Sequence, residues 1–240
     1  DQSLLTVLAL GFAGLAIIQF APSWPRSLVL LTLNTALWYQ AIVNLFRDFN
    51  QMAPGGFYSA GLHPWYLSAD HEREMDLLKQ YAAPSHVLAI GETGLDKACR
   101  TAWALQVTMF RLQIELAMEW QKPLIIHCVR AWNEVMEILQ EYAVNVPVIF
   151  HGYQKGLALA RQLTNLGYYL SFGHSLEQER NREVLRGIPV NQFFLETDDT
   201  PVPIARVYNY AAIALSIDLN TLDLQIQQNA KAVFGPSFIV

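Results

Sequence analysis

The 240-residue chain is poor in charge and in cysteine. Charged side chains make up 15% of it and the formal net charge is −5, so its mildly acidic surface argues against broad, non-specific binding to a nucleic-acid backbone. Its two cysteines, Cys99 and Cys128, lie far apart, which excludes a disulfide framework and a CxxC metal pair. The sequence also lacks a phosphate-cradling glycine-rich loop and a dinucleotide-binding fingerprint, so a nucleotide-cofactor role has no support. Hydrophobic residues account for 52%, which excludes disordered, collagen-like and coiled-coil classes.

Charge is almost absent from residues 1–56, and the run Leu4–Phe20 has none. This run is at the short limit of what can span a bilayer, and no Lys or Arg precedes it as in a signal peptide. Three interpretations stay open: a helix buried against the domain, a membrane or signal anchor, and an oddity of the gene start. We expect one domain over residues 1–240, with 1–27 as an apolar extension. We also expect a cytoplasmic protein, with membrane association through Leu4–Phe20 as the alternative.

Short apolar runs rich in β-forming residues alternate with amphipathic segments along the chain. This alternation favours a parallel α/β fold, and a count of eight strands favours a (β/α)8 TIM-type barrel over an open sheet. Only short stretches join the first three strands, so the barrel is expected to be irregular in its first third. The expected strands are Leu28–Asn34, Gln40–Phe46, Phe57–Leu62, Val87–Gly91, Pro123–His127, Pro147–His151, Tyr168–Phe172 and Phe193–Thr197. The expected helices are His71–Tyr81, Trp103–Trp120, Trp132–Tyr142, Lys155–Leu166, Leu176–Arg186 and Thr221–Phe234, the last ending at Gly235-Pro236.

Four of these apolar runs lead directly into side chains that bind metal ions. The carboxyl ends of parallel barrel strands share one face, so these side chains are expected to meet there. Imidazole and carboxylate groups are the ligands of Zn²⁺, Mn²⁺ and related ions. We therefore predict one or two divalent ions, of Zn, Mn, Ni or Mg, bound by Glu92, His127, His151 and Asp198.

This predicted site suits metal-assisted hydrolysis. A divalent ion lowers the pKa of a coordinated water, and Asp198 would accept the proton as the catalytic base. Glu196 would orient a metal ligand. Arg130 and Lys155 follow two of the ligand strands, where they would contact phosphate oxygens or simply face solvent. Trp65 and Tyr66 would stack on a base or cover the barrel rim.

The sequence around these residues resembles the TatD family of metal-dependent hydrolases, within the amidohydrolase-like barrels. The resemblance covers roughly residues 57–235. It implies a (β/α)8 barrel with one or two divalent metals that hydrolyses phosphodiester bonds, often as a deoxyribonuclease acting from a 3′ end. A DNA or nucleotide phosphodiester is then the expected substrate. The sequence indicates no protein partner. The matching strings, in order, are GLHPWYL (61–67), AIGETGLD (89–96), KPLIIHC (122–128), IFHGY (149–153), FFLETDD (193–199) and NAKAVFG (229–235).

The resemblance also implies a role for each matching residue. Glu92 matches the carboxylate that bridges two metals, and His127 and His151 match the histidines that hold one of them. Asp198 matches the aspartate near the other metal, which is proposed to activate the water. His63 matches a motif position, where we expect it to contact substrate and not to bind metal.

One feature of the family is missing from the chain. Family members begin with a strand that ends in His-x-His and holds the second metal, whereas here no histidine precedes His63. Asn34 and Ala36 occupy those positions if Leu28–Asn34 is the matching strand. The chain is then a one-metal variant, a degenerate member, or a chain whose first 50 residues lie outside the ancestral reading frame. A barrel that binds metal or nucleotide without turnover is the alternative function.

Overall fold

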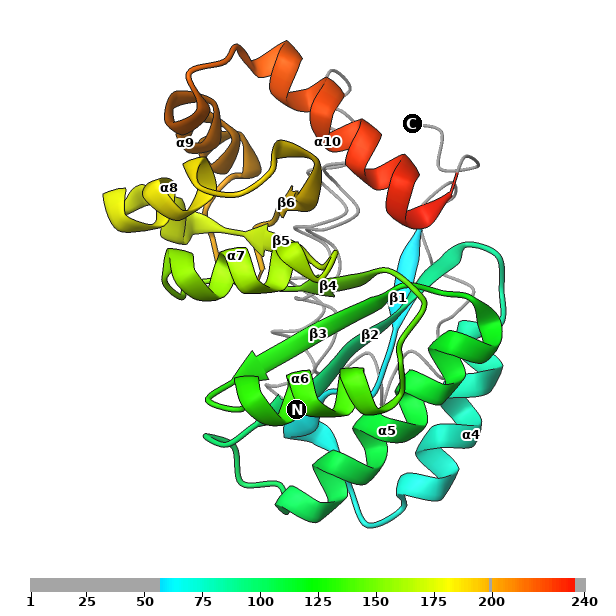
Figure 1. The fold of residues 1–240 in the computed structure, drawn as a ribbon. Coiled ribbons are helices and arrows are strands. Elements are labelled where there is room, and N and C mark those ends of the chain that lie inside the picture. Colours follow the sequence, from blue (N-terminus) through cyan, green and yellow to red (C-terminus); the bar gives the residue numbers. More distant parts are fainter. Residues whose placement is uncertain (1–56, 199, 236–240) are drawn as a thin grey trace.

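The computed structural model describes residues 57–198 and 200–235. The apolar run Leu4–Phe20 and the two expected strands Leu28–Asn34 and Gln40–Phe46 lie outside these residues. Within them, strands and helices alternate along the chain, which confirms the α/β class (Figure 1). None of the helices in this part is long and apolar enough to cross a membrane.

Six parallel strands form one curled sheet whose spatial order follows the chain order, as in the wall of a (β/α)8 barrel (Figure 1). Every neighbouring pair is parallel. The strands are β1 (Tyr58–Ala60), β2 (Val87–Asp96), β3 (Leu124–Val129), β4 (Val148–Phe150), β5 (Tyr169–Phe172) and β6 (Phe193–Leu195).

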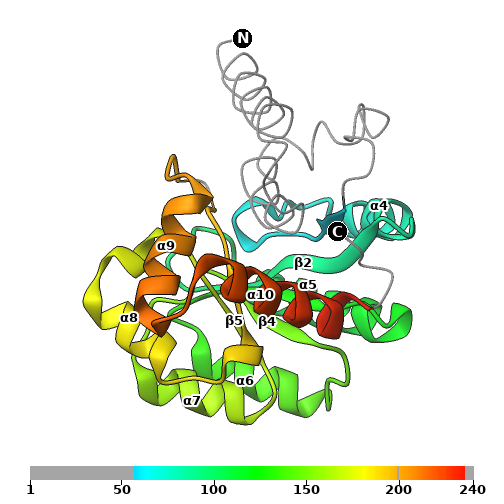
Figure 2. The ribbon, with the colours of Figure 1, turned by 90° about the horizontal axis from the view of Figure 1, so that it is seen from above.

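Helices pack along the outside of this sheet (Figure 2). They are α4 (His71–Ala82), α5 (Trp103–Trp120), α6 (Trp132–Glu141), α7 (Leu157–Asn165), α8 (Glu179–Arg186), α9 (Ile204–Leu215) and α10 (Leu219–Phe234), with short 3₁₀ helices η2 (Pro64–Tyr66), η3 (His174–Glu177) and η4 (Val190–Gln192). Helix α9 was not expected from the sequence, and it begins directly after Pro203, which is its N-cap residue. The expected helix Leu176–Arg186 was too long: its first turn belongs to η3, and α8 begins only at Glu179.

Strand β2 is longer than the sequence suggested, because it continues past Gly91 to Asp96. Gly91 and Gly94 have φ values of 149° and 142°, which other residues rarely adopt. They also let β2 approach β3 closely: a Cβ on Gly94 would lie 2.1 Å from the carbonyl oxygen of His127. The expectation that Glu92 ends its strand was therefore wrong. Glu92 lies inside β2, and Asp96 ends it.

The core lies between the sheet and its helices, and a buried glutamine of α5 acts in it as a polar clamp. Phe110 and Ile114 of α5 pack into this core, and Gln113 between them is also fully buried. Its Oε1 accepts a hydrogen bond from the backbone N of Leu62 at 2.6 Å, and its Nε2 donates to the backbone O of Leu62 at 3.1 Å. Helix α5 thereby fixes the loop that follows β1, which carries His63.

Replacing Gln113 with Leu tests this clamp. The substitution leaves the buried N–H and C=O of Leu62 without their side-chain partner, and each such group costs about 1–3 kcal/mol. We expect a matching loss in the free energy of unfolding, measured by calorimetry. Gln140→Leu, at an exposed position of α6, is the control and should change it by about 0.5 kcal/mol or less. Equal losses in the two variants would contradict the clamp.

Candidate metal centre

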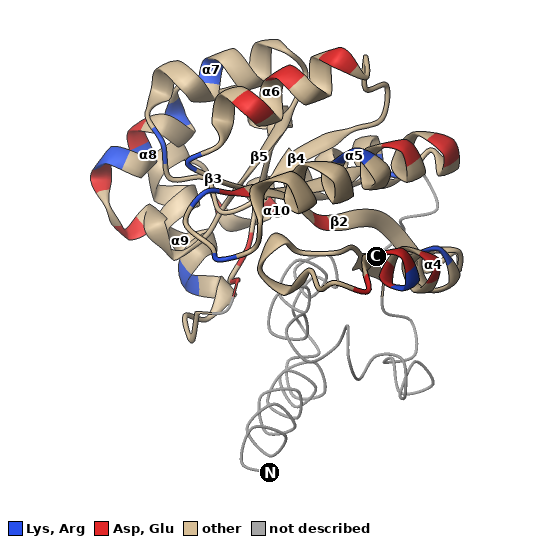
Figure 3. Ribbon diagram, turned by 90° about the horizontal axis from the view of Figure 1, so that it is seen from below, with Lys and Arg blue, Asp and Glu red and all other residues tan. Residues whose placement is uncertain are grey.

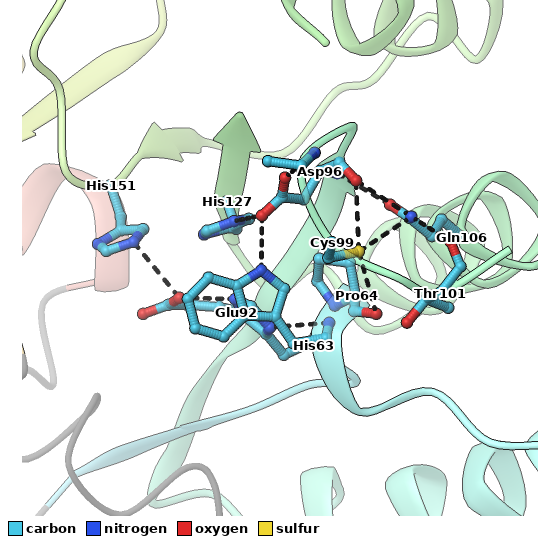
Figure 4. Close-up of polar contacts among 11 residues, drawn as sticks. His63, Pro64, Glu92, Asp96, Cys99, Thr101, Gln106, His127 and His151 are labelled. Atoms are coloured by element: carbon cyan, nitrogen blue, oxygen red, sulfur yellow. Dashed lines mark hydrogen bonds and ion pairs between the residues drawn. The ribbon is translucent and has the colours of Figure 1, made fainter. Parts of the chain in front are cut away.

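Histidine and carboxylate side chains from five segments of the chain converge at the carboxyl edge of the sheet. Figure 4 shows four of them, His63, Glu92, His127 and His151. His63 lies in the loop after β1, Glu92 in β2 and His127 in β3. His151 directly follows β4, and Glu196 directly follows β6. Of the six described strands, β2 alone carries acidic side chains, those of Glu92 and Asp96. Red marks an acidic position on β2 in Figure 3. Parallel strands thus bring together residues that are far apart in the sequence.

The first group of possible ligands is His63, Glu92 and His127, all of them buried. One donor atom from each lies within 4.8 Å of the others. His63 Nε2 is 3.7 Å from Glu92 Oε2, and the His63 and His127 ring centroids are 4.4 Å apart. The sequence suggested substrate contact for His63, and the structure adds it to the residues that could hold an ion.

The second group is His151, Glu196 and Asp198, with donor atoms again within 4.8 Å of one another. His151 lies between this group and the first, because its Nε2 is 3.4 Å from Glu92 Oε2 and its Nδ1 is 3.4 Å from Glu196 Oε1. Glu92 therefore lies between His63 and His151 (Figure 4). Glu92 thus belongs to the first group and also contacts His151 of the second, so it would be available as a ligand if a cation were bound here.

Glu196 is a buried carboxylate that the fold keeps ionised. It accepts hydrogen bonds from Ser171 Oγ at 2.5 Å and from the backbone N of Gly152 at 2.8 Å. Burial alone would raise its pKa, but His151 and these hydrogen bonds outweigh burial and hold the pKa below its usual value. The arrangement suits the orienting role expected for Glu196, because its other contact is His151 Nδ1.

The pKa values of the three histidines are shifted in two different directions. Burial, together with the neighbouring His127 and His151, lowers the pKa of His63 to about 2. Burial also lowers the pKa of His127. Burial likewise acts to lower the pKa of His151, but Glu92, Glu196 and Asp198 outweigh it and raise the pKa to about 10. His151 would therefore have to release a proton to bind a cation through its imidazole.

The donor set at this edge fits a divalent cation. Neutral imidazoles are the form that binds metal, and His63 and His127 are held in that form. The carboxylates of Glu92, Glu196 and Asp198 exceed the one positive charge of His151, and an excess of partly buried negative charge is costly without a cation. Mixed imidazole and carboxylate donors suit Zn²⁺, Mn²⁺ and related ions.

Asp96 is a further residue of this site, which the sequence analysis missed. Its side chain is almost fully buried, and its Oδ2 lies 3.1 Å from His127 Nε2. The same oxygen accepts a hydrogen bond from Trp65 Nε1 at 2.5 Å, and Oδ1 accepts one from the backbone N of Ala98 at 2.6 Å. Burial acts to raise the pKa of Asp96, but the hydrogen bonds outweigh it and hold the pKa well below its usual range. Asp96 thus fixes the orientation of the His127 ring.

The remaining predicted residues lie around this centre. Arg130 and Lys155 are exposed on the loops that follow β3 and β4, at the same edge of the sheet. Their contact with phosphate stays a prediction. Cys128 packs partly buried against the core, and burial raises its pKa to about 12, which suits a packing role.

The fold and this edge define a class of protein, the parallel barrels that act as metal-dependent hydrolases. A family model described as TatD related DNase matches residues 16–235. An uncharacterized metal-dependent hydrolase from Buchnera aphidicola subsp. Baizongia pistaciae is 30% identical over 192 residues, which is 77% of this chain and 71% of that protein. A second uncharacterized metal-dependent hydrolase, from Buchnera aphidicola subsp. Acyrthosiphon pisum, is 28% identical over 230 residues, which is 85% of this chain and 86% of that protein. The chain belongs to the TatD family of metal-dependent hydrolases.

Solved structures support the fold. The TatD homologue YjjV from Escherichia coli K12 superimposes with a TM-score of 0.67 at 21% identity, covering 82% of each chain. A TatD family hydrolase from Entamoeba histolytica gives a TM-score of 0.68 at 18% identity, covering 82% of this chain and 80% of its own. These likenesses confirm the (β/α)8 class expected from the sequence.

Replacing Asp96 with Asn tests whether its charge holds this edge together. The substitution keeps the shape, but a neutral amide is a weaker acceptor and directs N–H groups at donors. We expect the free energy of unfolding of the protein in EDTA to fall by about 1–3 kcal/mol in urea titrations. Asp70→Asn, at an exposed position before α4, provides the comparison and should stay within about 0.5 kcal/mol of wild type. A loss no larger than that of the comparison would exclude this role for Asp96.

Proposed function

We propose that the chain hydrolyses phosphodiester bonds with one or two bound divalent ions, and that its substrate is DNA or a nucleotide phosphodiester. The observation that carries the proposal is the position of Glu92 between His63 and His151, with Asp198 within reach of His151. Glu92, His127 and His151 are the proposed ligands, and Asp198 is a further one. When bound, a divalent cation supplies Lewis-acid activation of water and stabilises negative charge on the phosphate.

Each protein group then has a defined task. Asp198 is the proposed base that accepts the proton of the attacking water, and its partly exposed position leaves it open to solvent. Glu196 and Asp96 orient His151 and His127. Arg130 and Lys155 are proposed to contact phosphate oxygens from the loops after β3 and β4, and His63 to lie against the bound substrate.

The family model supports a nuclease, because its description contains the word DNase. The names of the curated relatives go no further than metal-dependent hydrolase. A cytoplasmic location is also part of this proposal and rests on the sequence alone.

Cleavage of a labelled single-stranded oligodeoxynucleotide tests the proposal. The protein is stripped with EDTA and assayed with Mg²⁺, Mn²⁺, Ni²⁺ or Zn²⁺ in turn, as wild type and as Glu92→Gln. We expect cleavage that requires a divalent ion, and a fall in kcat/KM of about 100-fold or more in Glu92→Gln, because a central charged donor is lost. Glu137→Gln, on the exposed face of α6, is the matched control and should retain wild-type activity.

Two results would count against hydrolysis. Full activity of Glu92→Gln would exclude Glu92 from the machinery. Binding of metal and oligonucleotide without any cleavage, even at high protein concentration, would favour the second candidate function, a barrel that binds without turnover. The sequence observation behind that candidate is the lack of a His-x-His pair anywhere in the 240 residues, with Asn34 and Ala36 at the corresponding positions.

A further inference from the structure

Trp65 is unusually exposed for a large aromatic side chain that lies against the candidate metal centre. Its exposed fraction is 53%, compared with 37% for Trp103, which lies at the start of α5. Tryptophan is costly to leave in contact with water, and it is enriched at positions where proteins bind partners. The exposed surface of Trp65 is therefore available to a ligand.

The indole of Trp65 is held in one orientation. Its Nε1 donates a hydrogen bond to the buried Asp96 Oδ2 at 2.5 Å, and the backbone N of Trp65 donates to His63 Nδ1 at 3.2 Å. The N–H is the only polar group of the side chain, and it is used within the protein. The surface left to a ligand is consequently carbon, which binds by stacking and not by hydrogen bonding.

The indole plane of Trp65 is nearly perpendicular to the rings of His63 and His127, the histidines of the first ligand group. Its ring centroid lies 5.2 Å from that of His63 and 5.8 Å from that of His127, at interplanar angles of 87° and 79°. A planar group resting on the indole would therefore lie beside the candidate metal centre. In a nucleotide, the planar group beside the phosphate is the base.

We propose that Trp65 is a substrate-binding residue that stacks on the nucleobase next to the scissile phosphate, so that recognition requires an aromatic base but does not select among bases. The inference rests on the proposed function, whose substrate class it narrows. Stacking tolerates any base, because each has a π face. A side chain already fixed by Asp96 loses little conformational freedom when the base binds, which favours affinity.

Isothermal titration of the full chain, as purified, tests the proposal with two probes. The probes are 5′-dAMP and 2-deoxyribose 5-phosphate, which carries a hydroxyl group in place of the base. We expect wild type to bind 5′-dAMP about tenfold more tightly than the sugar phosphate. Trp65→Leu should lose this preference while its affinity for the sugar phosphate stays unchanged. Trp65→Phe keeps a ring without the N–H donor and should retain most of the preference.

Trp103→Leu removes another exposed tryptophan and is the matched control, so its preference should equal that of wild type. The proposal is overturned if wild type shows no preference for 5′-dAMP, whether or not either probe binds. It is also overturned if Trp65→Leu keeps the preference, or if Trp103→Leu loses it equally. A loss in Trp65→Phe as large as in Trp65→Leu would assign the effect to the hydrogen bond with Asp96 and would likewise exclude stacking.

The outcome is separable from that of the proposed hydrolysis, because binding is measured without turnover. A Trp65-dependent preference in a chain that cleaves no oligodeoxynucleotide would leave the stacking role intact and remove the nuclease. Metal-dependent cleavage without a preference for 5′-dAMP would leave the nuclease intact and remove the stacking role of Trp65.

Discussion

Buried negative charge at the carboxyl edge of the sheet is the constraint around which the described structure is organised. Glu92, Asp96 and Glu196 are each 5% exposed or less, and carboxylates in such places are costly unless cations or hydrogen bonds compensate them. Backbone and side-chain donors satisfy Asp96 and Glu196. Glu92 lies among imidazoles, of which His63 is held neutral by burial. This charge balance suits a bound divalent ion, and it links the stability of the edge to its proposed chemistry.

The scaffold holds these groups by close backbone contacts and buried polar clamps. Gly91 and Gly94 allow β2 to lie against β3, which brings Glu92 and His127 onto one edge. Gln113 ties α5 to the loop that carries His63. Asp96 then joins that loop to β3, because it accepts from Trp65 and contacts His127. Ligand positions on three segments are thereby coupled to one another, which is what a preorganised metal centre requires.

Much of this arrangement could be predicted from the sequence, because continuous apolar runs leading into His127 and His151 are a local signal. The rest depends on contacts between distant segments. Glycines inside an apolar run usually indicate a break, so the strand was expected to end at Gly91, and Asp96 was given no role in the site. The proximity of His63 to Glu92 arises from the pairing of β1 with β2, for which a single sequence carries no local pattern.

Locating a bound ion directly is the measurement that tests the account most sharply. Crystals grown with Mn²⁺ or Zn²⁺ would be measured at the absorption edge of the metal, and the anomalous difference map would show where it binds. The account predicts a peak in contact with Glu92, at about 2.0–2.2 Å from its carboxylate and from histidine nitrogens of the same edge for Zn²⁺. A peak that contacts other residues only, or a map without a peak at this edge, would contradict it.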